Sequence, residues 1–359
     1  MANEFQLELW KRLTEAPGAP GFEGPVRDIM REYIGQYTNE LVYDNLGSMF
    51  GVMRGDEQGP RIMVAGHMDE VGFMVTRISE KGFISFQTLG GWWGQVLLAQ
   101  RVQIITGKGV IEGVISSIPP HVLSDDQRNR PMDVRNMYVD IGADTREEAE
   151  RLGIRPGQPI LPICPFQVMA NPRRIMAKSW DNRYGCSLAV ELAKELHENP
   201  GHPNVVYVGA TVQEELSGAR GAKTAAELIQ PDLFLAVDAS PAGDIPGVRE
   251  EGGKLGGGLL MRIYDPLYVM PVGLRELLIS TCEEEKIPYQ IYVAKGSTDA
   301  GVVQNHGKGV PSAVIGIPSR YIHSHASIID TADYEAAKRL LFSIVRKLDR
   351  GTWESILPR

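Results

Sequence analysis

The sequence has 359 residues, of which 43% are hydrophobic and 23% are charged, with a net charge of -8 and an isoelectric point near 5.5. Its length favours two domains, and its composition is typical of a globular protein. The acidic balance argues against nucleic acid or an anionic membrane as the main partner.

The first part of the chain is predicted to be helical. The N-terminal segment is amphipathic and lacks the apolar core of a secretory signal. Helices are expected over Phe5–Thr14 and over about Pro25–Tyr37, and short strands then lead to the run RIMVAGHMDE. From Phe73 to about Cys164, short β-like runs separated by glycines and polar turns predict a small β-barrel or sandwich, with one helix in DTREEAERLGI.

After Cys164 the sequence alternates between strands and helices, which indicates a β-sheet flanked by helices. One helix is expected at Asn182–Glu198 and a last one at about Ala332–Leu348. The predicted fold class is therefore α/β, with a mixed sheet formed by residues 1–72 and 165–359 and a β-rich domain inserted at 73–164. Three widely spaced cysteines form no disulfide framework, and no run of about twenty apolar residues could span a bilayer. We expect a cytoplasmic protein.

Histidine and acidic residues follow the apolar runs that are predicted to be buried strands. These residues are His67, Asp69, Asp181, Glu214, Glu215, Asp238 and His323. In open α/β sheets, ligands bind beyond the carboxyl ends of the strands. Two histidines and three carboxylates would satisfy two divalent cations if one carboxylate bridges them, and a fourth carboxylate then remains for acid–base chemistry. Such sites hold their ions roughly 3.5–4 Å apart, and mixed imidazole and carboxylate ligation suits Zn²⁺, Co²⁺ or Mn²⁺.

Each of these residues also has a structural interpretation. Residues two apart in an extended chain point the same way, so Asp69 can reach the far nitrogen of His67 and fix its tautomer, although the pair could also form a surface turn. Asp181, taken alone, is better explained as a helix cap. Glu214 and Glu215 could end a solvated strand, or one could bind a metal while the other faces a metal-bound water.

Two further residues sit beside predicted strands. Asp238 directly follows LFLAV, so its carboxylate is poorly solvated unless it is paired or bound to metal. Of His323 and His325, one is expected to be a surface histidine or a partner of a ligand.

Six motifs give the chain a resemblance to a known family. GHMDEVGF, SWDNRYGC, QEELSGARGA, AVDAS, GSTDAG and RYIHSHASIID resemble, in order, the signatures of the M42 aminopeptidases, which include glutamyl and tetrahedral aminopeptidases. The resemblance implies a zinc-peptidase-like catalytic domain with two divalent metal ions, which removes N-terminal residues from short peptides. It also implies that residues 73–164 form a dimerisation domain and that the chain is a homo-oligomer, in the form of a dimer-based assembly such as a tetrahedral dodecamer.

The resemblance further implies a role for each candidate residue. His67 and Asp238 would hold one metal, Glu215 and His323 the other, and Asp181 would bridge both. Glu214 would be the general base acting on the water between the metals, and Asp69 would orient His67.

Other positions remain open. The segment LSGAR is one residue longer than the family pattern, and His325 replaces a usual proline. Asp299 is expected to cap a helix rather than line the pocket, and Arg220 to pair with a structural carboxylate rather than a substrate. Trp92 and Trp93 are assigned to packing or a subunit interface, and loops 243–258 and 264–271 to the pocket walls.

Two alternative functions follow from the same residues. The first is another metal-dependent hydrolase on this scaffold, such as a deblocking enzyme, a deacylase or a glucanase-like enzyme. Glycosidases normally use two carboxylates without metal, so sensitivity to chelators separates these classes. The second is a non-catalytic binding protein, which would lack a ligand or the base, whereas every predicted position is filled.

Overall fold

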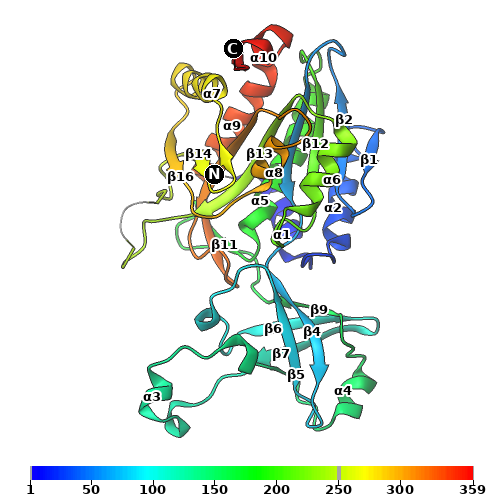
Figure 1. The fold of residues 1–359 in the computed structure, drawn as a ribbon, viewed down its shortest axis with the longest axis vertical. Coiled ribbons are helices and arrows are strands. Elements are labelled where there is room, and N and C mark those ends of the chain that lie inside the picture. The colour runs from blue at the N-terminus through cyan, green and yellow to red at the C-terminus, as the bar shows by residue number, and fades with distance from the viewer. Residues whose placement is uncertain (1, 249–251, 359) are drawn as a thin grey trace.

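The computed structural model describes residues 2–248 and 252–358. Figure 1 shows a large sheet with helices packed around it and, beneath it, a β-barrel formed by the cyan and green middle part of the chain. The predicted fold class, with a mixed sheet flanked by helices and an inserted β-rich unit, is confirmed. None of the helices in these two ranges is long and apolar enough to cross a membrane.

The described residues form a mixed sheet of nine strands in the order β1-β2-β12-β3-β13-β17-β14-β15, with β16 beside β14. The strands are β1 (Leu41–Tyr43), β2 (Met49–Arg54), β3 (Arg61–His67), β12 (Val205–Thr211), β13 (Leu233–Pro241), β14 (Leu259–Asp265), β15 (Tyr268–Val269), β16 (Tyr289–Val293) and β17 (Ser312–Ser319). The central strands β12, β3, β13 and β17 run parallel, and their side chains are almost continuously buried, as expected for strands covered on both faces. Their carboxyl ends therefore meet at one edge of the sheet.

Helices flank this sheet, and most of them pack directly against its strands. They are α1 (Glu4–Glu15), α2 (Gly24–Ile34), α5 (Trp180–Glu198), α6 (Arg220–Ile229), α7 (Val272–Glu284), α8 (Asp299–Gln304), α9 (Thr331–Lys347) and α10 (Arg350–Ile356). Helix α5 is central, because it packs against β3, β12 and β13 and its apolar stripe, which includes Leu188, Leu192 and Leu196, is fully or almost fully buried. Helix α10 was not predicted, α8 is the helix expected next to Asp299, and α2 ends at Ile34, three residues before the predicted end.

A small three-stranded sheet lies apart from the large one. It consists of β10 (Gln167–Val168), β11 (Arg174–Ala177) and β18 (Ser327–Asp330). The run IMAKSW was predicted to be a buried strand leading to Asp181, but its strand, β11, ends at Ala177 and belongs to this small sheet. Asp181 therefore reaches the site from the first turn of α5, where its backbone is not helical.

The inserted segment forms a closed barrel in the order β4-β5-β8-β7-β6-β9, with antiparallel neighbours. Its elements are β4 (Gly72–Ile78), β5 (Ile84–Leu89), η1 (Gly94–Val96), β6 (Arg101–Thr106), β7 (Gly109–Ile115), η2 (Pro120–Val122), α3 (Asp125–Arg128), η3 (Val134–Asn136), β8 (Val139–Asp140), α4 (Arg146–Leu152) and β9 (Pro159–Pro162). The barrel has its own apolar core, which includes Phe73, Ile104 and Ile160. The regularly spaced short runs therefore form a barrel rather than a sandwich, and the helix expected in DTREEAERLGI is α4.

Candidate active site

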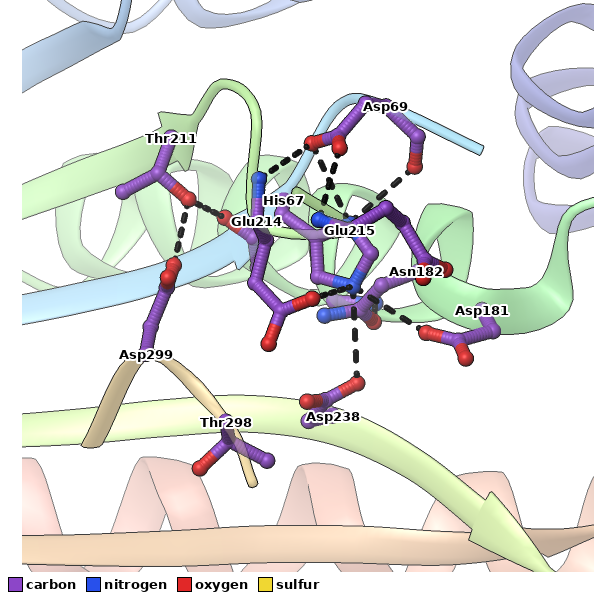
Figure 2. Close-up of polar contacts among 12 residues, drawn as sticks. His67, Asp69, Asp181, Asn182, Thr211, Glu214, Glu215, Asp238, Thr298 and Asp299 are labelled. Atoms are coloured by element: carbon purple, nitrogen blue, oxygen red, sulfur yellow. Dashed lines mark hydrogen bonds and ion pairs between the residues drawn. The ribbon is translucent and has the colours of Figure 1, made fainter. Parts of the chain in front are cut away.

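The five predicted metal ligands and Glu214 converge beyond the carboxyl ends of the central strands. His67 is the last residue of β3, Asp238 lies within β13, and Glu214 and Glu215 follow β12. Asp181 comes from the start of α5, and His323 from the loop between β17 and β18. Figure 2 shows the side chains of His67, Asp181, Glu214 and Asp238 pointing toward one another.

Asp181 stands between the two histidines. Its Oδ1 lies 3.1 Å from His67 Nε2, and its Oδ2 lies 3.1 Å from His323 Nε2. His67 Nε2 is also 3.8 Å from Asp238 Oδ1, and His323 Nε2 is 3.3 Å from Glu215 Oε1. Two sets of possible ligands result, each with donor atoms within 4.8 Å of one another: His67 with Asp181 and Asp238, and His323 with Asp181 and Glu215.

The donor atoms fit a pair of divalent cations. Asp238 Oδ1 and Glu215 Oε1 are buried and accept no hydrogen bond, and an unpartnered buried carboxylate oxygen is costly unless a cation neutralises it. The imidazole and carboxylate donors are those that Zn²⁺, Co²⁺ and Mn²⁺ accept. A third set combines His67 with Glu214 and Glu215, so the geometry alone leaves Glu214 a possible ligand.

Backbone carbonyls fix the orientation of both imidazoles. His67 Nδ1 lies 3.0 Å from the carbonyl oxygen of Asp69, and His323 Nδ1 lies 2.8 Å from that of Gly91. An Nδ1–H that donates to a carbonyl leaves Nε2 free to face the site, which is the usual arrangement for a metal ligand. The sequence indicated the Asp69 carboxylate for this task, but that carboxylate lies 3.4 Å from His67 Nδ1, farther than the carbonyl.

The Asp69 carboxylate instead holds the loop that carries the two glutamates. It is fully buried and accepts the backbone N–H of Glu214 at 3.1 Å and that of Glu215 at 2.9 Å. Asp69 therefore supports two parts of the site: its backbone carbonyl orients His67, and its side chain holds the loop that carries Glu214 and Glu215.

Burial and the close spacing of acidic side chains shift the pKa values of several residues in the site. Burial raises the pKa of Asp238 well above its usual range, and the charge of Asp181 adds to the effect. Burial also raises the pKa of Glu214, although the nearby His67 opposes the shift. Burial disfavours the charged form of Asp181 too, but hydrogen bonds from His323 and His67 outweigh it and lower the pKa of Asp181. The carboxylates in turn overcome burial and raise the pKa of His67 well above its usual range, so metal-free protein holds protons that a cation would displace.

A cavity of about 1430 Å³ opens beside these residues. Its walls include Gly243, Val248 and Gly252 from the predicted loop 243–258 and Leu267 from loop 264–271, while residues 249–251 lie outside the described residues. The segment 292–298 forms another wall. The volume exceeds the roughly 300–1,000 Å³ of pockets for drug-sized ligands, so it has room for a peptide.

Asp299 is buried beside the site, although the sequence assigned it to a helix cap. Thr298 is the N-cap of α8, and Asp299 is 4% exposed. Thr211 Oγ1 donates to Asp299 Oδ2 at 2.5 Å, a contact visible in Figure 2, and burial raises the pKa of Asp299 to about 7. The capping interpretation was therefore wrong; a threonine immediately before the aspartate was the signal that favoured a different cap.

Arg220 and His325 take other positions. Arg220 donates to Gln213 Oε1 at 3.3 Å and forms no ion pair with a carboxylate in residues 2–248 and 252–358, so the expected structural pair is not present there. His325 is half-buried, and burial lowers its pKa; it is not among the residues that line the cavity.

Comparison with known proteins agrees with this geometry. The family model described as M42 glutamyl aminopeptidase matches residues 47–340, and a second model, described as AMPT, matches residues 5–30. The glutamyl aminopeptidase of Lactococcus lactis subsp. cremoris (strain MG1363) is 39% identical over 342 residues, which cover 94% of this chain and 95% of that protein.

Two solved structures share the fold. The TET aminopeptidase from the marine sediment archaeon Thaumarchaeota archaeon SCGC AB-539-E09 is 42% identical, with a TM-score of 0.96 over 99% of this chain and 100% of that one. The Pyrococcus horikoshii TET1 peptidase is 28% identical, with a TM-score of 0.85 over 96% of this chain and 100% of that one. These matches and the site define a peptide hydrolase. The chain belongs to the M42 family of aminopeptidases.

Proposed function

We propose that this chain is a dinuclear metal-dependent aminopeptidase that removes N-terminal residues from short peptides. His67 and Asp238 would hold one cation and His323 and Glu215 the other, and Asp181 would be shared between them. The observation that carries the proposal is the position of Asp181, whose two oxygens each lie 3.1 Å from the Nε2 of a different histidine. The unpartnered oxygens of Asp238 and Glu215 support the same assignment.

Glu214 is the proposed general base. Its Oε2 lies 3.8 Å from His67 Nε2, and its backbone is fixed by Asp69, so its carboxylate is held at the edge of the ligand set. When bound, a pair of divalent cations polarises the peptide carbonyl and lowers the pKa of the attacking water. Glu214 accepts the proton of that water and then donates it to the departing amine, which completes the acid–base cycle.

The surplus of acids explains why cleavage would be restricted to the N-terminus. Glu214 and the carboxylates of the ligand set line one part of the cavity, and their negative charge attracts the ammonium group of a free N-terminus. An internal peptide bond brings no such charge to the site.

The same proposal includes domains and assembly. Residues 1–72 and 165–359 form the catalytic domain, and residues 73–164 form a barrel that mediates dimerisation. The TET1 peptidase of Pyrococcus horikoshii can assemble into a tetrahedron or a large octahedral shell, which supports a homo-oligomer built from dimers for this chain. Light scattering of the purified protein measures the mass of the assembly.

The test uses aminoacyl p-nitroanilides after removal of metal by a chelator, with Co²⁺, Zn²⁺ or Mn²⁺ added back separately. We expect release of p-nitroaniline only with metal, and none from the matched N-acetylated substrates. Release from the acetylated substrates would favour a deblocking enzyme or deacylase, and metal-dependent cleavage of glucans would favour a glucanase-like enzyme. Either result in place of aminopeptidase activity would refute the proposal.

A further inference from the structure

The segment Gly90–Trp92 leaves the barrel after β5 and lies against the candidate metal ligands. The carbonyl oxygen of Gly91 accepts the hydrogen bond from His323 Nδ1 at 2.8 Å, and Gly91 lines the cavity. His67 Nδ1 donates the corresponding bond to the carbonyl oxygen of Asp69, which follows β3 of the large sheet. The two imidazoles are therefore oriented from different parts of the fold, and that of His323 is oriented from the barrel side.

Gly90 is needed for this close approach, and Gly91 lies in contact with His323. Gly90 has a φ of +88°, and a Cβ there would lie 2.6 Å from Val71 Cγ1 and 3.3 Å from Glu215 Oε2. A Cβ on Gly91 would lie 3.4 Å from His323 Nδ1. The backbone of the segment thus packs directly on Glu215 and His323, the two residues assigned to the same cation.

Trp92 fixes the segment to the barrel. Its Nε1 donates to the carbonyl oxygen of Gly72 at 3.1 Å, and its ring stacks on Phe73 with centroids 4.8 Å apart and an interplanar angle of 19°. Phe73 is 1% exposed and belongs to the barrel core, where its ring also meets Phe86. The neighbouring Trp93 is 64% exposed.

We infer that Gly90–Trp92 is a positioning segment through which the inserted barrel fixes the Glu215 and His323 half of the site, with Trp92 as its anchor. The inference rests on the proposed pair of cations. It makes the affinity for one cation depend on the barrel, whereas the cation held by His67 and Asp238 depends on the large sheet. Asp181 serves both.

The test is a calorimetric titration of metal-free protein with Zn²⁺ in the wild type and in W92A, with W93A as the matched control. We expect two cations per chain in the wild type and in W93A. In W92A, one cation should bind about 10–100-fold more weakly, the usual effect of removing a group that orients a ligand, while the other keeps its affinity. W92F keeps the ring stacking but loses the bond to Gly72, so its loss should be smaller.

Two further variants assign the effect to the correct half of the site. H323A should bind one cation, and adding W92A to H323A should cause no further loss, because the anchor acts through His323 and Glu215. G90A should also weaken binding of the cation assigned to His323 and Glu215, without altering the barrel core. This variant can therefore be used for the test if W92A folds poorly.

Three results would overturn the inference. They are a W92A protein that binds both cations like the wild type, a W92A protein that loses both affinities equally, and a G90A protein with unchanged affinities. A wild-type protein that takes up fewer than two cations would instead refute the proposed function on which the inference depends.

Discussion

Replacement of Glu214 by glutamine tests the assignment of the base most sharply. The substitution keeps the size and the backbone bond to Asp69 but removes the group that accepts a proton. Loss of a general base typically costs about 10²–10⁴-fold in rate, which corresponds to roughly 2.7–5.5 kcal/mol of activation free energy. We therefore expect kcat for an aminoacyl p-nitroanilide to fall by that factor in E214Q.

The metal content of the same variant distinguishes a base from a ligand. The two ligand sets that share Asp181 do not contain Glu214, whereas the third possible set does. If Glu214 is the base, E214Q should retain two cations after dialysis, as measured by elemental analysis.

The stability of the metal-free variant gives an independent check. Because burial and nearby acids raise the folded-state pKa of Glu214, its protonated form stabilises the fold, and this contribution is lost as the pH rises through the folded pKa. Glutamine mimics the protonated form, so metal-free E214Q should be at least as stable as the wild type at neutral pH in thermal unfolding.

E191Q provides a matched control. Glu191 is also a buried glutamate, but it accepts hydrogen bonds from Gln6 and Tyr334 in the body of the fold. Its replacement should leave kcat unchanged. Wild-type turnover in E214Q, or a loss of metal from it, would refute the assignment of Glu214 as the base.

Three other predictions concern the metal ligands and their support. H67A and H323A should each lose one of the two cations in elemental analysis, and full metal content in either variant would remove that residue from the ligand set. Because neighbouring carboxylates raise the pKa of His67 in metal-free protein, protons compete with the cation, so affinity should fall as the pH falls and binding should release protons. Calorimetry in buffers of different ionisation enthalpy measures that release, and a pH-independent affinity would contradict the reasoning. In D69N, the side chain offers one acceptor oxygen to the two backbone N–H groups that now bond to the Asp69 carboxylate, so one N–H group stays unpaired. The free energy of unfolding in urea should therefore drop by about 1–3 kcal/mol. An unchanged free energy of unfolding would show that the loop does not need the carboxylate.

The large sheet and the barrel were predictable because their signals are local. Buried runs such as those of β3 and β13 alternate with amphipathic helices, and short runs at regular intervals distinguish the barrel. The short helix α10 and the small sheet of β10, β11 and β18 were missed. These elements carry little periodicity of their own and depend on contacts made elsewhere in the fold.

The candidate site was predictable in part for the same reason. His67 and Asp238 lie on parallel neighbours of one sheet, so their convergence follows from strand direction. The position of Asp181 does not follow, because it depends on a non-helical turn at the start of α5. The contact between Gly91 and His323 spans 232 positions and joins the barrel to the large sheet, and no sequence pattern indicates it.

Anomalous diffraction from crystals grown with Zn²⁺, recorded at the zinc absorption edge, tests the central claim most directly. We predict two peaks per chain, one beside His67 and one beside His323, with Asp181 between them. A single peak, or peaks that do not contact Asp181, would contradict the dinuclear site and the mechanism built on it.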